Sequence, residues 1–244
     1  LNTRNMSISG GGTLDNSTLT NQGTITWLGD PTINAGAVFL NDTTGIVDSQ
    51  SWNDMLGTGT FENRGLIKRT AGSLDTDFHV NFINNNGSFD VQVGIIDLEG
   101  GSSHSGTVTV DNGLLRLVGG THTLADGLVL NGTGTLEMVS GTTELGGDLT
   151  VNGTYTITNG TIDFGTNGSL TGGTGTINWG NVSIIGDMTN DQTLTFTSDK
   201  TINANVTNNG TFLVDNDATI NITTPFNNNG IVEVTGGSTF QVSG

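Results

Sequence analysis

Apolar and polar positions alternate along the chain in a short phrase that returns about every twenty residues. The phrase reads "NNGTFLV" at residues 208–214 and "NNGIVEV" at residues 228–234. Two and four residues after its glycine lie apolar or aromatic side chains, with a polar residue between them in most copies. An alternation with a period of two predicts β-strands that each bury one face.

Ten copies of the phrase align on a central anchor residue, which is glycine in nine of them. The buried position four residues after the anchor is apolar in every copy except one, where it is Arg69. Asn and Gly suit the corner before the strand because both tolerate the left-handed backbone region. We predict structural corners at Asn63, Asn85, Asn208, Asn228, Gly23, Gly65, Gly87, Gly113, Gly210 and Gly230.

Successive anchors lie 17 to 26 residues apart, except for one interval of 42 residues that equals two turns of 21. Stacked coils explain why the same residue types return at the same corner, since like positions of a parallel β-helix lie about 4.8 Å above one another. Coils of variable length favour the right-handed triangular form. We therefore predict an all-β, right-handed parallel β-helix (β-solenoid) of about 12 coils of about 20 residues.

No composition break divides the chain, so we expect residues 1–244 to form a single β-solenoid domain. The sequence "LNTRNMSISGGG" at its start has neither an initiator Met nor the apolar centre of a signal peptide. We expect a segment of a longer chain, or a unit that stacks head to tail on other copies and leaves no strand edge unpaired.

Charge narrows the range of partners. The chain has 23 acidic and 6 basic residues, a formal net charge of −17, and no Cys. Such a surface repels nucleic acid and anionic membranes, so we expect no nucleic-acid partner. No apolar run approaches the roughly 18 residues of a membrane helix, so we expect no membrane insertion.

Several phrases, among them "LTNQGTITW", "FENRGLIKR" and "FNNNGIVEV", resemble the β-helical passenger or stalk regions of autotransporters and filamentous-haemagglutinin-like bacterial surface proteins. The resemblance extends over residues 10–240 and implies an exported scaffold at the cell surface or outside the cell. Coils of this kind also carry proteases, toxins, tailspikes and polysaccharide lyases, so the resemblance implies a fold more than an activity.

Candidate binding residues lie where the repeat is interrupted. Residues 46–58, "IVDSQSWNDMLGT", break the pattern and bring Trp52 close in sequence to Asp48 and Asp54. A Trp ring flanked by carboxylates suits a sugar, although the segment is equally a capping or bulging loop. Trp27 and Trp179 occupy buried positions of the phrase and are expected in the core.

Half of the basic residues, Arg64, Lys68 and Arg69, fall in the segment "ENRGLIKRT". They would bind a carboxylated polysaccharide or the acidic face of another copy, and the alternative is a solvated turn. The pairs Asp75 and Asp77, and Asp215 and Asp217, are compatible with calcium loops. The further oxygen ligands of an EF-hand are absent, so calcium is the one cofactor left open.

No catalytic set stands out. The three histidines, His79, His104 and His122, lack metal-ligand spacing, and the alternation of "DFHVNF" places His79 on the surface. Six basic residues provide little for a lyase site. We expect a non-enzymatic scaffold, stalk or fibre segment of an extracellular adhesin or matrix protein, with glycans or host cell-surface molecules as partners. The alternatives are a polysaccharide-binding or polysaccharide-degrading β-helix and, less favoured because charges interrupt its Thr arrays, an ice-binding solenoid.

Overall fold

A computed structural model describes residues 5–72 and 74–243. These residues form thirty β-strands and no helix. The strands of the largest sheet are β1 (Met6–Ile8), β3 (Thr18–Asn21), β4 (Thr24–Trp27), β6 (Val38–Asn41), β7 (Ile46–Ser49), β9 (Thr60–Asn63), β10 (Leu66–Arg69), β11 (Thr76–Phe78), β12 (Asn81–Asn85), β13 (Ser88–Leu98), β14 (Ser102–Ser105), β15 (Thr107–Leu117), β16 (Thr121–Leu124), β17 (Leu128–Asn131), β18 (Thr135–Met138), β19 (Thr142–Leu145), β20 (Asp148–Val151), β21 (Thr154–Asp163), β22 (Ser169–Thr171), β23 (Thr176–Asn190), β25 (Lys200–Asn208), β27 (Thr219–Ile222), β28 (Phe226–Asn228) and β30 (Thr239–Val242).

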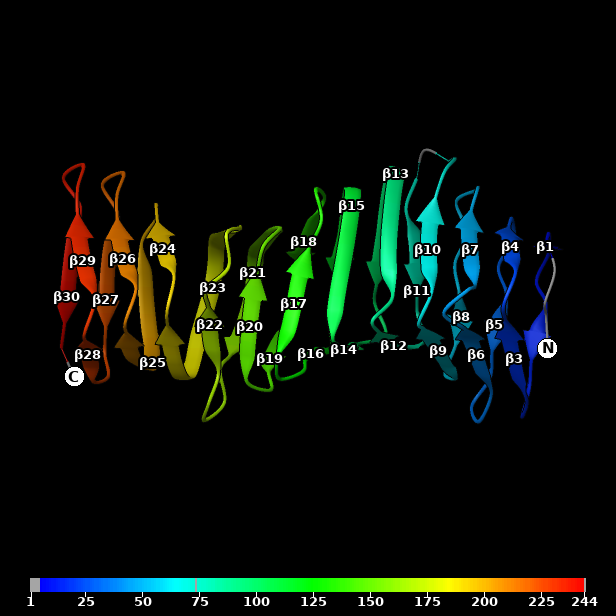
Figure 1. Cartoon of the computed structure of the whole chain (residues 1–244), viewed down its shortest axis with the longest axis horizontal. Helices are drawn as coiled ribbons and strands as arrows, with labels where there is room; N and C mark the ends of the chain where they lie inside the picture. Colours follow the sequence, from blue (N-terminus) through cyan, green and yellow to red (C-terminus); the bar gives the residue numbers. More distant parts are fainter. Residues whose placement is uncertain (1–4, 73, 244) are drawn as a thin grey trace.

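Two smaller sheets complete the walls. They contain β2 (Thr13–Leu14), β5 (Thr32–Ile33) and β8 (Leu56–Gly57), and β24 (Thr193–Phe196), β26 (Thr211–Val214) and β29 (Ile231–Val234). Figure 1 shows the coils stacked side by side along one long axis, with the two chain ends at opposite ends of the rod.

The strands pair in parallel with those one coil away, which confirms the predicted β-solenoid of about 12 turns. In the first half of the rod Ile25 lies beside Val47, Val47 beside Ile67, and Ile67 beside Phe89. The coil of Val47 fills the interval of 42 residues between two sequence anchors, as expected for two turns of 21 residues. Like residues therefore stack on like residues through this part of the chain.

The interior is a continuous apolar column. Phe61 stacks between Phe39 and Phe82, with ring centroids 4.8 and 5.4 Å apart, and Phe196 stacks on Phe212 at 4.7 Å. These separations equal the coil spacing, because each ring lies directly above the equivalent ring of its neighbour. Each fully buried ring contributes on the order of 1.5–3 kcal/mol through the hydrophobic effect, so the column stabilises the rod along its length.

Buried asparagines form ladders at the corners. In the first ladder Nδ2 of Asn63 donates to Oδ1 of Asn84 at 2.9 Å, and Nδ2 of Asn41 donates to Oδ1 of Asn63 at 2.8 Å. In the second, Asn190 donates to Asn208 at 2.7 Å and Asn208 to Asn228 at 2.8 Å. The middle amides, Asn63 and Asn208, thus both donate to and accept from their neighbours, which satisfies polar groups that would otherwise be buried alone.

One corner residue differs from the sequence prediction: the ladder contains Asn84, not Asn85. Counted from the ladder asparagine, the corner "NNNG" at residues 84–87 has one more residue than "NRG" at residues 63–65, and Asn86 takes the left-handed backbone conformation, with φ of 59°, to accommodate it. Counting two residues back from Gly87, as from Gly65, therefore gives Asn85, which is one residue after the asparagine of the ladder. For the same reason Phe82, and not Ile83, points into the core.

Glycine is required at the corner by close packing between coils. A Cβ atom on Gly65 would lie 2.3 Å from the carbonyl oxygen of Gly45 and 2.4 Å from that of Asp42. Both atoms belong to backbone that cannot move aside. A side chain at this position would therefore force two coils apart.

The stacking order shifts in the middle of the rod. Strands β13 and β15 are each 11 residues long and continue around a corner, so that Phe89 lies beside Val110 while Leu115 lies beside Ile96. The phrase after Gly113 consequently stacks on the next wall and not on the phrase after Gly87. Alignment of anchors cannot reveal this shift, because both walls have the same alternation.

Candidate functional site

The structure does not bring the sugar-binding candidates of residues 46–58 into one site. Residues Ile46–Ser49 are a regular strand, so the break in the repeat is shorter than predicted. Trp52 is 68% exposed. Asp48 lies on the wall that contains β7 and β10, whereas Asp54 precedes Met55, which pairs with Phe78 on the wall of β11.

The Asp48 carboxylate is already occupied by neighbouring groups. Its side chain is 6% exposed and forms an ion pair with Lys68 at 3.2 Å. Thr70 Oγ1 donates to it at 2.7 Å and Gln50 Nε2 at 2.8 Å. Arg64 Nε likewise donates to Glu62 at 2.7 Å. The two accessible cations of the basic segment thus each have an acidic partner, and no common basic patch results.

The prediction that Arg69 binds a ligand at the surface is wrong, because its side chain is completely buried. Its guanidinium Nη1 donates to the carbonyl oxygen of Ser51 at 2.9 Å and to Ser49 Oγ at 3.2 Å, and it also bonds Thr76 Oγ1 and the carbonyl oxygen of Leu74. Burial lowers the pKa of Arg69, while nearby carboxylates raise it. The side chain ties two corner loops to the interior and so has a structural role.

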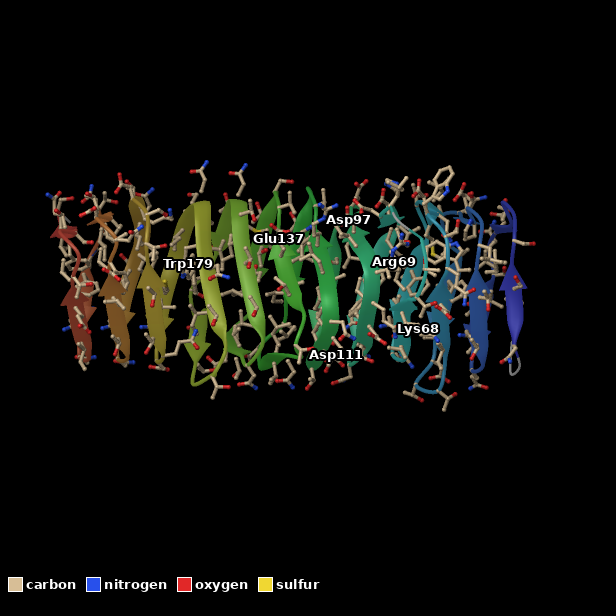
Figure 2. All side chains as sticks on the ribbon, turned by 90° about the horizontal axis from the view of Figure 1, so that it is seen from above. Lys68, Arg69, Asp97, Asp111, Glu137 and Trp179 are labelled. Carbon is tan, nitrogen blue, oxygen red and sulfur yellow. The ribbon has the colours of Figure 1, made fainter. Side chains whose placement is uncertain are left out.

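Carboxylates stack on the outer face of the wall that contains β11. Asp77 lies beside Asp97, and Asp54 is level with Asp77 on the preceding coil. Burial, followed by repulsion from Asp97, Asp54 and Glu99, raises the pKa of Asp77 to about 6. Its buried Oδ1 atom has no hydrogen-bond partner. Figure 2 shows Asp97 and Glu137 along one edge of the rod and Lys68 and Asp111 toward the other.

Arg116 neutralises part of this stack. It pairs with Asp75 at 2.8 Å and also with Asp97. Ligand atoms of Asp54, Asp77 and His79 lie within 4.8 Å of one another, as do those of Asp77, Asp97 and Glu99.

These groups are the nearest approach to a cation site in the described part of the chain. The first group contains a histidine, and Arg116 already pairs with Asp97 of the second, so both are a poor match for calcium, which prefers oxygen ligands. The second predicted pair does not form a cluster with a third acidic or histidine ligand among the described residues. Asp215 accepts a hydrogen bond from Thr235 at 2.7 Å, and Asp217 lies in a turn with φ of 60°.

His79 is exposed, as the alternation predicted, whereas His104 and His122 are buried. His122 Nε2 lies 2.7 Å from the carbonyl oxygen of Gly119, so this nitrogen carries a hydrogen. Its Nδ1 then accepts from Ser102 Oγ at 2.6 Å, and Ser102 accepts in turn from His104 Nε2 at 2.8 Å. Burial lowers the pKa of His104 to about 3, so the ring is neutral. This Ser–His chain packs inside the coil, out of reach of a substrate.

Among the described residues, the wall opens between the coil of β23 and that of β24. Trp179 of β23 and Phe196 of β24 stack in the interior with ring centroids 5.5 Å apart. The strands above these rings do not pair: residues 176–179 pair only with β21, and β24 pairs only with β26. A continuous groove results, with two hollows of about 470 Å³ each. The repeat departs here in one respect: the phrase of β24 follows Gln192, the one anchor that is not glycine.

A comparison of the chain with protein-family models, with curated proteins and with solved structures finds no significant match.

Proposed function

We propose that the chain is a non-enzymatic structural scaffold, a stalk or fibre segment of an extracellular or cell-surface adhesin or matrix protein. The observation that carries the proposal is the apolar column, which continues from Ile25 to Ile222 through stacked coils. Twelve coils at about 4.8 Å each make a rod roughly 55 Å long. A rod of this kind separates whatever is attached to its two ends by a fixed distance.

The charged residues also support a structural role. Arg69, the one cation at an interior position of the phrase, ties loops together, and the accessible Arg64 and Lys68 have acidic partners. The buried Ser–His chain links Ser102, His104 and His122 to one another inside the rod. Among the described residues no helix is long and apolar enough to cross a membrane.

The exposed edges of the stack support the proposal of head-to-tail association. The last strands include exposed apolar side chains, among them Ile231 at 59% and Val242 at 45% exposure. A flanking coil or a second copy would cover these groups and pair the free strand edges. We propose head-to-tail stacking as the mode of assembly, whether between copies or between segments of one longer chain.

Electron microscopy across a range of concentrations tests the proposal. Straight rods about 55 Å long, or filaments with that axial repeat, are the expected images. Compact particles without an axial repeat would contradict the scaffold function. An activity assay on neutral and acidic polysaccharides provides the complementary test, because turnover would favour the polysaccharide-degrading alternative.

A further inference from the structure

We propose that the groove between β23 and β24 binds a neutral glycan. This inference goes beyond the scaffold function and does not depend on it. The groove is the place where the ladder of backbone hydrogen bonds along this wall is interrupted. Polar groups that are paired in every neighbouring coil are directed into it.

The register identifies these polar groups. In a parallel ladder, alternate residues direct both N–H and C=O toward the same neighbouring strand. Thr176 N donates to Gly153 on the preceding coil, so Ile177 and Trp179 present their backbone groups to the groove. Thr211 N donates to Gln192 on the other side, so Thr193 and Thr195 present theirs from the opposite lip. Both lips therefore supply donors and acceptors.

Two side chains line the groove besides these backbone groups. Trp179 is only 7% exposed, and its ring stacks on Phe196 beneath the lips. Gln192 lines the adjoining hollow. Figure 2 shows where Trp179 lies along the rod.

The narrow width of the groove favours a sugar over a peptide strand. An inserted strand would need the two coils to separate to roughly 9.6 Å, twice the usual spacing. The stacked rings of Trp179 and Phe196, at 5.5 Å, close the floor well short of that width. Sugar hydroxyls need only reach the lips, and each hydroxyl both donates and accepts, as this mixture of backbone groups requires.

The charge of the groove selects for neutral glycans. Asp191 is its only ionisable side chain, and the remaining lining consists of Gly, Thr, Asn, Gln, Ile and Trp residues. No cation is present to bind a uronate or a sulfate, and the net charge of the chain is −17. Acidic glycans are therefore repelled.

Binding is tested on the intact chain with malto-, cello-, xylo- and mannohexaose as neutral probes and hexagalacturonate as the acidic probe. The three Trp residues give three indole N–H resonances. We expect at least one neutral hexasaccharide to shift that of Trp179 and leave that of Trp27 in place. Hexagalacturonate should bind at least tenfold more weakly. If no neutral probe shifts Trp179, or the acidic probe binds equally well, the proposal is wrong.

Two variants and one control locate the site by calorimetry. Thr195→Trp fills the groove and should abolish binding, whereas the control Thr26→Trp, at the same place in a phrase of the first half, should retain it. Thr193→Trp fills the groove where its two hollows meet and should also abolish binding. Undiminished affinity in Thr195→Trp or Thr193→Trp would overturn the assignment. The Thr193 variant keeps the test decisive if the Thr195 substitution prevents folding.

Discussion

Replacing Asn84 with alanine tests whether the amide ladder stabilises the rod. Asn84 Oδ1 accepts from Asn63 at 2.9 Å, and its Nδ2 donates to the carbonyl oxygen of Gly87 at 3.1 Å. Loss of two neutral hydrogen bonds costs about 2 kcal/mol, and the stranded buried donor on Asn63 adds about 1–3 kcal/mol. We therefore expect Asn84→Ala to lower the free energy of unfolding by roughly 3–5 kcal/mol.

The neighbouring residue provides a matched control with the same substitution. Asn85 accepts one solvent-exposed hydrogen bond, from Asn86 at 3.2 Å. Asn85→Ala should therefore change the free energy of unfolding by less than about 1 kcal/mol, as expected for a surface change. Urea denaturation followed by circular dichroism measures both variants, with the m-value checked for constancy. Equal losses for the two variants, or a larger loss at Asn85, would refute the assignment of the ladder.

Three further predictions concern charges and the exposed ring. Asp77→Asn should raise the denaturation midpoint at pH 7, and this gain should disappear toward pH 4. The folded-state pKa of Asp77 is about 6, above the ordinary 3.8, so its carboxyl makes the native state less stable as the pH rises between these two values. Arg69→Ala should lower the free energy of unfolding by about 3 kcal/mol or more, whereas Arg64→Ala should stay within about 0.5 kcal/mol. Trp52→Ala should also stay within about 0.5 kcal/mol and should remove the most iodide-quenchable part of the fluorescence, since the ring is 68% exposed.

Each of these predictions has a result that contradicts it. A gain of the same size at pH 4 and pH 7 would show that Asp77 does not titrate as inferred, and Asp217→Asn, in an exposed turn, controls for the loss of one charge. Similar losses of unfolding free energy for the two arginine variants would mean that burial does not determine how much Arg69 stabilises the protein. Unchanged quenching in the Trp52 variant would place that ring inside the rod.

Much of the fold is determined by local alternation. The two apolar positions of each phrase predict a half-buried strand, and the near-constant interval between anchors predicts the stack and its number of coils. Trp27 and Trp179 are in the core as predicted, because their position in the phrase is sufficient to orient the side chain. The same pattern revealed the extra coil around Val47 although no anchor marks it.

What the tertiary structure decided is register, pairing and burial across coils. Asn84 replaces Asn85 in the ladder because a single left-handed residue absorbs one extra position, and a slip of one residue reverses which side chains face the core. Asp54 and Asp77 meet only because their coils stack, and Arg69 is tolerated inside only because two loops converge on it. The groove beside Trp179 is likewise not determined by the alternation, since alternation orients a strand but does not determine whether its neighbour lies close enough to bond.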